Sequence, residues 1–285
     1  MIAQWDDHEV TNNWWPGEPL TRAEHLRKKY VEKNALLLMA RGSRAFHEYM
    51  PTRQTSAEPG RIYRKISYGP LLDVFMIDMR SYRGPNGENM QQTYGPDAHY
   101  LGPAQIAWLK RELLNSRATW KVLAADMPIS LVVTYDADRN WGSEAVAQGD
   151  NGPPRGREIE IADLLSFMKR AGIRNTMWIT ADRHYTAAHY YDPNKAAFQD
   201  FDPFWEFVSG PIHSSTFDTS ELDNTFGPQL IFAKAAPKGG RLPPSEGMQF
   251  FGHVAVDGQT EVMTVTLKDV DDHALWSKKL EPKVD

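Results

Sequence analysis

Three short apolar segments, separated by amphipathic helical patterns, constrain the fold of this chain most strongly. Residues 71–79, 120–125 and 175–180 read as strands, and residues 72–77 are almost continuously apolar, as expected of a strand covered on both faces. Between them we predict one helix that Pro103 opens and a second over residues 159–171, with Gly172 as its C-cap. This alternation predicts an α/β fold built from packed layers.

The segments outside this core carry weaker patterns. Residues 250–256 and 261–267 alternate around an Asp-Gly pair, which predicts a β-hairpin. Residues 61–66 read as a strand, and residues 22–40 and 44–50 read as two helices. Residues 136–156 are rich in Gly, Asp, Asn and Pro, so we predict a long surface loop there.

The composition excludes several classes of function. The chain has 285 residues and no cysteine, which excludes disulfides, zinc ribbons and cysteine nucleophiles. Its net charge of −5 leaves no basic field for a nucleic-acid backbone. No apolar run approaches the roughly 20 residues of a membrane-spanning helix, and residues 1–6 show no signal peptide. The glycine motifs of nucleotide-binding loops and the serine-hydrolase elbow are absent.

Two polar clusters could bind a metal ion. The first is Asp-Asp-His-Glu at residues 6–9, which combines carboxylates for hard cations with an imidazole for borderline metals. A solvated N-terminal segment is the alternative reading. The second is Asp182 and His184 after the strand at 175–180, at the end where sites in open α/β sheets form. A structural Asp–His hydrogen bond is the alternative there.

Polar residues also follow the other two predicted strands. Arg80 could clamp a phosphate with two parallel hydrogen bonds. For Arg83 a surface ion pair with Asp78 or Glu88 is the better interpretation. Asp126 follows the strand at 120–125, and it is either a metal ligand or a cap of a turn.

Two further features have a functional and a structural interpretation. His213 lies in a loop of small residues at 209–215 that could bring backbone N–H groups to an anion or simply connect two elements. The nine tryptophans could stack on sugars, although scattered tryptophans belong more often to a core.

Several segments together resemble the PhoD-like alkaline phosphatases, which belong to the metallophosphatase superfamily. The similar stretches run in the family order along nearly the whole chain: WDDHEVTNNW at 5–14, IDMRSYR at 77–83, LG at 101–102 with Gln105 and WL at 108–109, WKVL at 120–123, ADRHYTAA at 181–188, FWEFVSGP at 204–211 and LW at 275–276. The first of these motifs and the order of the others make the resemblance specific.

The resemblance implies a double β-sheet sandwich flanked by helices, and hydrolysis of phosphate monoesters or diesters at a cluster of metal ions, with calcium and iron as cofactors. By the match of motifs, Asp7, Asp182 and His184 would be metal ligands, and Asp126 falls where the superfamily has a middle ligand. His8 would face the phosphate or the leaving group. The substrate would be a phosphorylated small molecule or polymer, and the family is usually exported to the periplasm or the exterior.

The first motif begins at residue 5, whereas family members carry a long segment before it. We therefore expect residues 1–285 to be the C-terminal part of the metallophosphatase domain, without the strands that supply a bridging aspartate. That expectation predicts low activity and low stability for the isolated chain. A non-catalytic remnant and a carbohydrate-binding module are the alternative functions.

Overall fold

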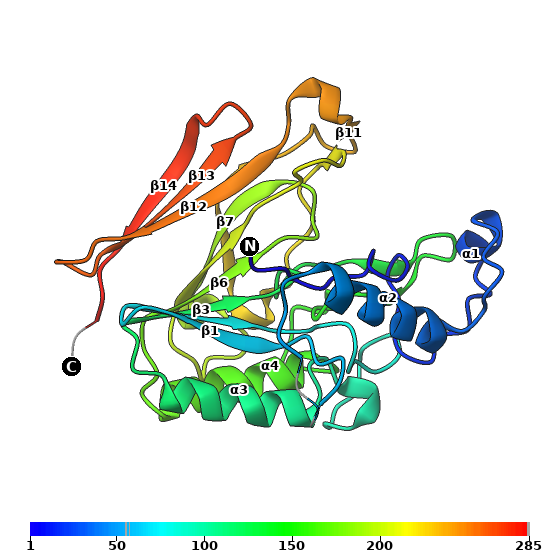
Figure 1. Ribbon diagram of the computed structural model, residues 1–285, viewed down its shortest axis with the longest axis horizontal. Coiled ribbons are helices and arrows are strands. Elements are labelled where there is room, and N and C mark those ends of the chain that lie inside the picture. The colour runs from blue at the N-terminus through cyan, green and yellow to red at the C-terminus, as the bar shows by residue number, and fades with distance from the viewer. Residues whose placement is uncertain (55, 57, 284–285) are drawn as a thin grey trace.

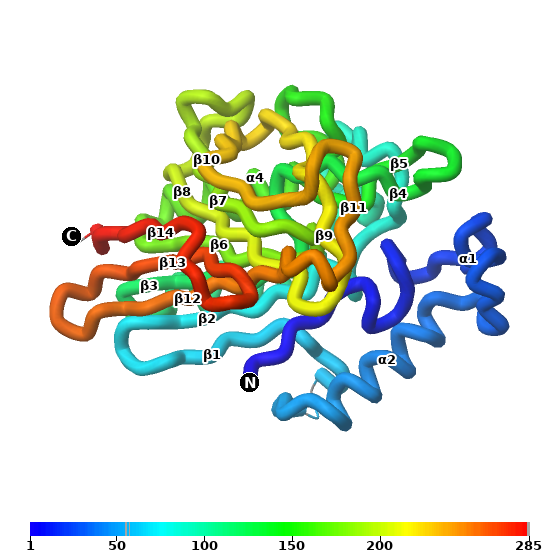
Figure 2. Tube along the Cα trace, turned by 90° about the horizontal axis from the view of Figure 1, so that it is seen from above, coloured from blue at the N-terminus to red at the C-terminus, as the bar shows by residue number. Residues whose placement is uncertain are grey.

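A seven-stranded mixed sheet forms the centre of the computed structural model, which describes residues 1–54, 56 and 58–283 (Figure 1, Figure 2). In spatial order its strands are β1 (Arg64–Tyr68), β2 (Leu72–Met76), β3 (Trp120–Ala124), β6 (Thr176–Thr180), β8 (Phe204–Val208), β7 (Thr186–Tyr191) and β10 (Pro228–Lys234). The middle strands β2, β3, β6 and β8 are parallel, and β1, β7 and β10 pair antiparallel at the two sides. The three strands predicted from the apolar segments are confirmed as the neighbours β2, β3 and β6.

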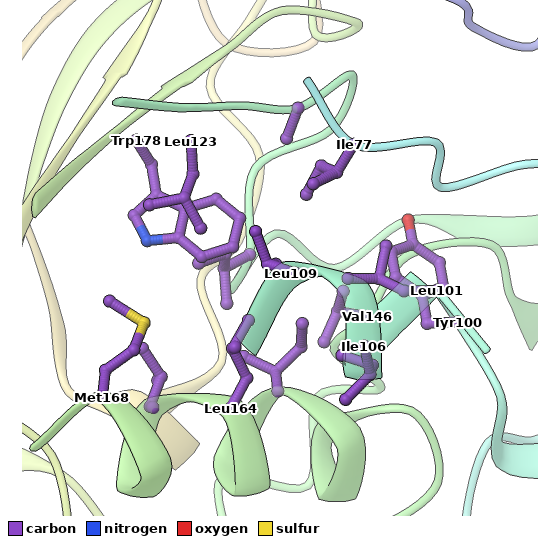
Figure 3. Packing of buried hydrophobic residues seen from close by; sticks show 14 of the residues in the cluster. Ile77, Tyr100, Leu101, Ile106, Leu109, Leu123, Val146, Leu164, Met168 and Trp178 are labelled. Carbon is purple, nitrogen blue, oxygen red and sulfur yellow. The ribbon is translucent and has the colours of Figure 1, made fainter. Parts of the chain in front are cut away.

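Two helices cover one face of this sheet, α3 (Pro103–Asn115) and α4 (Glu158–Arg170). Leu109 and Leu164 on their inner sides lie in one cluster with Leu123 and Trp178 of the central strands (Figure 3). All four side chains are fully buried, and burial of each large apolar side chain contributes roughly 1.5–3 kcal/mol. Both predicted helices are confirmed, and Gly172 after α4 has a φ of 66°, which glycine adopts without strain.

A second, smaller sheet packs on the other face of the large one. It consists of β12 (Phe250–Val256), β13 (Met263–Asp269) and β14 (Ala274–Leu280). Alternate residues of β13, including Val265 and Leu267, are buried against Val122, Met177 and Phe207 of the large sheet. The predicted hairpin is confirmed as β12 and β13, and β14 joins it as a third strand that the sequence pattern did not reveal.

The predicted helix over residues 22–40 is wrong. The structure has a short helix α1 (Ala23–Arg27) and a separate long helix α2 (Ala35–Tyr49), which also absorbs the helix predicted at 44–50. Lys29 has a φ of 55°, which a right-handed helix does not allow, and the Asn34 side chain caps the N-terminus of α2 by accepting from the Leu36 backbone N–H.

The prediction of a surface loop over residues 136–156 is also wrong in part. The strands β4 (Thr134–Asp136) and β5 (Trp141–Ser143) pair there, and residues 143–147 are buried. The remaining short elements are β9 (Thr216–Phe217), paired with β11 (Arg241–Leu242), and the 3-10 helices η1 (Pro96–Ala98), η2 (Pro193–Lys195), η3 (Asn224–Phe226) and η4 (Pro244–Glu246).

The observed architecture is mixed α/β, with two sheets face to face and helices on the outer side of the larger one. This confirms the predicted α/β class and its packed layers. The assignment to the metallophosphatase sandwich and the incomplete N-terminus stay predictions. None of the helices within the described residues has the length and apolar character required to span a bilayer.

Candidate functional site

The loop of residues 6–9 is anchored by the tryptophan that precedes it. Trp5 is fully buried, and its ring meets the rings of Trp14 and Phe46 edge-on, at centroid distances of 6.2 and 5.6 Å. Because Phe46 belongs to α2, this aromatic cluster fastens the loop to that helix.

The backbone of the same loop is held from both sides. A Cβ added at Gly42 of α2 would stand only 2.7 Å from the carbonyl oxygen of Glu9, so the helix can approach only because position 42 has no side chain. On the inner side, Asp7 accepts a hydrogen bond from the Asn13 backbone N–H at 2.8 Å. The Asp7 carboxylate is therefore buried in a fixed orientation.

Three further polar side chains enter the site from the carboxyl ends of parallel strands. Arg80 comes shortly after β2, Asp126 after β3 and Asp182 after β6. Backbone pairing continues beyond the strands, since the Ala181 N–H donates to the Asp126 carbonyl at 2.8 Å. Adjacent parallel strands thus bring residues that are about fifty positions apart in sequence to one edge of the sheet.

At this edge the structure forms an acidic cluster of Asp6, Asp7 and Asp182. One carboxylate oxygen from each residue lies within 4.8 Å of the others. Asp7 is buried, and Asp6 and Asp182 are partly exposed. Three converging carboxylates are a donor set that suits a hard cation.

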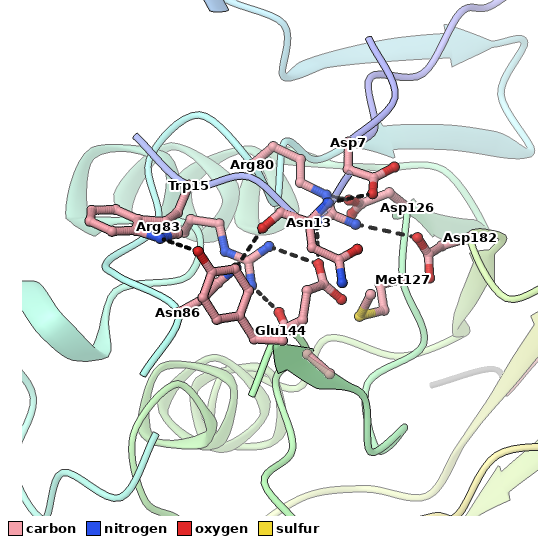
Figure 4. A network of polar contacts seen from close by, with 12 residues as sticks. Asp7, Asn13, Trp15, Arg80, Arg83, Asn86, Asp126, Met127, Glu144 and Asp182 are labelled. Atoms are coloured by element: carbon pink, nitrogen blue, oxygen red, sulfur yellow. Dashed lines mark hydrogen bonds and ion pairs between the residues drawn. The ribbon is translucent and has the colours of Figure 1, made fainter. Parts of the chain in front are cut away.

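Arg80 is the positive charge at the centre of the site (Figure 4). Its guanidinium is fully buried and donates to Asp126 at 2.7 Å, to Asp6 at 2.9 Å and to Asp182 at 3.4 Å, and it also pairs with Glu144. In this arrangement Arg80 is the counter-ion of the carboxylates. Its predicted role as a phosphate clamp would require some of these contacts to open.

The carboxylates still outnumber the positive charges around them. Burial raises the pKa of Asp6 to about 7, although the charge of Arg80 opposes this rise. Burial likewise raises the pKa values of Asp7, Asp126 and Asp182. In addition, Asp126 Oδ1 is buried without a hydrogen-bond partner in the described part of the chain. The site therefore fits a metal ion, which would supply the missing positive charge and a partner for the free oxygen.

His184 has a free ring nitrogen with which it could bind a metal ion. Its Nδ1 lies 2.6 Å from the carbonyl oxygen of Ser215, and a carbonyl can only accept, so Nδ1 carries the proton and Nε2 keeps its lone pair. The ring stacks on Phe217 with centroids 4.2 Å apart. Burial, together with the charges of Arg183 and Arg241, lowers the pKa of His184, which also favours the neutral, ligating form.

His8 lies at the exposed side of the acidic cluster. Its Nε2 is 3.9 Å from Asp7 Oδ1, and its side chain is 70% exposed. It can therefore reach a bound molecule from the solvent side, as its predicted role demands. Of the predicted residues, the structure brings Asp7 and Asp182 together, and Arg80 links both Asp126 and Asp182 to the same site.

Two residues of the site were missed by sequence reasoning. Asp6 was noticed only as part of its motif, yet it belongs to the acidic cluster. Glu144 was assigned to a surface loop, but it is buried and accepts from both Arg80 and Arg83. The predicted surface ion pair of Arg83 is accordingly wrong, because Arg83 is buried beside Glu144. The apolar run Ala-Val-Ala at 145–147 was the one signal that this segment is buried.

Arg157 explains how a segment rich in polar residues holds Glu144 so firmly. This fully buried guanidinium donates to the carbonyl oxygens of Ser143, Glu144 and Ala145 at 2.9–3.1 Å. It also bonds the side chain of Asn86 at 2.6 Å. Arg157 therefore ties two loops together behind the acidic cluster.

The remaining candidates lie outside this network. His213 is exposed in its loop. Trp5, Trp14 and Trp178 are fully buried, whereas Trp141 is the one tryptophan among the exposed large apolar residues in the described part of the chain. The structure therefore offers no row of exposed tryptophans, within the residues it describes, on which a sugar chain could stack.

The protein therefore has an α/β fold. Its acidic cluster, at the carboxyl ends of the parallel strands, is a candidate metal centre. The sequence model of the family described as PhoD-like phosphatase matches residues 1–267, and the chain belongs to this family. Alkaline phosphatase D of Bacillus subtilis (strain 168) is 29% identical over 193 residues, which are 64% of this chain and 30% of that protein.

A solved structure supports the fold. The structure titled "Structure of PhoD" matches 99% of this chain and 55% of its own chain, with a TM-score of 0.57 and 19% sequence identity. The chain thus spans less than a third of the curated relative over the matched region and about half of the solved one.

Proposed function

We propose that this chain is a metal-dependent phosphoric ester hydrolase that cleaves phosphate monoesters or diesters of small molecules or polymers. The observation that carries the proposal is the acidic cluster, in which Asp182 meets Asp6 and Asp7 from the opposite part of the sequence. Membership of the PhoD-like phosphatase family supports the phosphatase chemistry.

We assign the metal to the three residues of the acidic cluster and to the free oxygen of Asp126, and we propose that His184 joins them through the lone pair of its Nε2 when the ion is bound. Oxygen donors suit calcium, and the mixture of carboxylates with one imidazole also suits iron, so we propose these two metals. A bound ion would polarise the phosphoryl oxygens and offset the charge that develops on them.

The other residues of the site act on the substrate and on the charge balance. His8 is exposed and its Nε2 lies 3.9 Å from Asp7 Oδ1, so we propose that it donates a proton to the leaving oxygen. Arg80 fixes the positions of Asp6, Asp126 and Asp182 through its hydrogen bonds. Its positive charge also lowers the repulsion among these carboxylates when no ion is bound.

The test is hydrolysis of p-nitrophenyl phosphate and bis(p-nitrophenyl) phosphate by the purified chain, with calcium, iron or manganese and with a chelator. We expect turnover that the chelator abolishes. Asp182→Asn and His184→Ala should each reduce kcat at least roughly 100-fold and reduce the bound metal, because each removes a proposed ligand. Metal content is measured separately by mass spectrometry, so loss of the ion and loss of chemistry are distinguished.

Asp271→Asn is the matched control. Asp271 is exposed and belongs to a second acidic group with the partly exposed Asp269 and with His273, remote in sequence from the acidic cluster, and the same chemical change there should leave turnover unaltered. Turnover that persists in Asp182→Asn, or that ignores the chelator, would contradict the proposal.

A non-catalytic phosphate-binding role is the second candidate. It is favoured by one observation: Arg80 already contacts Asp6 and Asp182, so a cation must compete with a buried guanidinium for these oxygens. Folded chain that binds metal and phosphate but shows no turnover with either ester would support this role.

A further inference from the structure

Two arginines near His184 differ from those inside the site, because neither has a carboxylate partner in the part of the chain that the structure describes. Arg241 is exposed, and its Nε donates to the hydroxyl of Ser215 at 2.7 Å. Arg183 directly follows Asp182, and its Nε is buried without a hydrogen-bond partner. By contrast, Arg80 and Arg83 both pair with buried carboxylates.

Both guanidiniums are held against one aromatic ring. The central carbon of Arg241 lies 4.8 Å from the centroid of Phe217, and that of Arg183 lies 5.7 Å from it. Phe217 stacks in turn on the imidazole of His184. Cation–π contacts of this kind restrict the motion of a long side chain without neutralising its charge. The ring therefore keeps two unpaired positive charges next to a proposed metal ligand.

The ribbon that carries these groups is short and well fastened. β9, with Phe217, pairs with β11, with Arg241, and the Phe217 N–H donates to the His184 carbonyl at 2.8 Å. Ser215 accepts at its carbonyl from His184 and at its hydroxyl from Arg241. The distance between the arginine pair and His184 is thus set by backbone pairing, which suits a binding site that must act together with a metal centre.

We propose that Arg183 and Arg241 form the phosphate clamp of this protein, binding the non-bridging oxygens of an anionic phosphate ester beside His184. This inference rests on the proposed function and assigns the substrate-binding arginines. Arg80 is less suited to that role, because each of its three guanidinium nitrogens already bonds a carboxylate. A guanidinium offers a planar fork of N–H donors that matches two phosphate oxygens, so two unpaired forks favour a phosphate dianion over a singly charged diester.

The test is calorimetric titration of inorganic phosphate into the wild-type chain and into Arg183→Gln, Arg241→Gln and the double variant, at fixed ionic strength and metal content. Each substitution should raise the Kd for phosphate roughly tenfold. The reason is that losing one hydrogen bond to a charged group weakens binding by about a factor of ten or more. Arg241→Lys should keep part of the affinity, because it retains the charge and loses the fork. Arg111→Gln, at an exposed position on α3, is the control that removes one positive charge elsewhere.

The KM values for the monoester and the diester provide a second readout. We expect KM for the monoester to rise in both single variants while kcat and metal content change little, and the monoester to be affected more than the diester. Arg241 is exposed, so its variant tests the clamp even if substitution of the half-buried Arg183 disturbs folding, which a thermal melt reveals.

The outcomes separate this inference from the proposed function. Phosphate binding that the double variant loses would support the clamp even if the chain hydrolyses neither ester. Wild-type chain that binds no phosphate, or equal Kd values in the wild-type chain and Arg241→Gln, would overturn the clamp even if hydrolysis is observed.

Discussion

Replacing Glu144 with glutamine removes the only carboxylate that pairs with Arg83 in the described part of the chain. Both side chains of this pair are 0% exposed. Arg80 also loses a partner, but it keeps Asp126 at 2.7 Å and Asp6 at 2.9 Å. The main consequence of Glu144→Gln is therefore a buried, uncompensated guanidinium at Arg83.

The magnitude follows from that uncompensated charge. Removing one partner of a buried ion pair costs about 3–5 kcal/mol, whereas exposed pairs contribute about 0–1 kcal/mol. We expect Glu144→Gln to lower the free energy of unfolding by about 3–5 kcal/mol at pH 7. Urea unfolding followed by tryptophan fluorescence measures this difference. Glu48→Gln, in the exposed pair of Glu48 with Arg44, is the matched control and should change the stability by less than about 1 kcal/mol.

The loss of stability caused by Glu144→Gln should become smaller as the pH falls. Burial alone would raise the pKa of Glu144, but the charges of Arg80 and Arg83 outweigh it and hold the pKa below its ordinary value of 4.5. A depressed pKa contributes stability that is present above the unfolded value and is lost as pH falls through the folded value. The difference between variant and wild type should therefore narrow below about pH 4. A loss under about 1 kcal/mol at pH 7 would refute this account of the network.

Three further predictions test other parts of the structure. Leu267→Ala should lower the free energy of unfolding by about 2–5 kcal/mol in urea titrations, because this fully buried side chain joins the two sheets. Glu158→Gln should stabilise the protein by roughly 2–4 kcal/mol at pH 9 but not at pH 4. Burial raises the pKa of Glu158 from 4.5 to about 8, so stability is lost as the pH rises from about 4.5 to about 8 and the unfolded chain alone carries the charge. Equal stabilisation at both pH values would contradict this. Gly42→Ala should displace the Glu9 carbonyl, which a Cβ would approach to 2.7 Å, and weaken metal binding measured by calorimetry; unchanged affinity would show that α2 does not position the loop.

The sequence by itself determined the elements whose hydrophobic pattern is local. Strands β2, β3 and β6 are short apolar runs, and α3 and α4 show apolar residues at helical spacing, so each could be recognised without a partner. Arg80, Asp126 and Asp182 each follow one of these predicted strands, which made them candidates for the site, but only the structure shows that β2, β3 and β6 are neighbours and bring the three residues to one edge. The motif at residues 6–9 directed attention to Asp7, but its meeting with Asp182 depends on contacts between distant segments.

Only the tertiary structure decided the features that depend on such contacts. Apart from the apolar run at 145–147, nothing local distinguishes Glu144 from a solvated loop residue, because its burial comes from Arg157, Arg80 and Arg83 on other segments. The break between α1 and α2 is likewise hidden in the sequence, because helix-forming residues continue through it. The charge balance of the site also depends on contacts between distant segments. Arg80 is a buried counter-ion, rather than an open phosphate clamp, because the fold places four carboxylates around it that are distant from it in sequence.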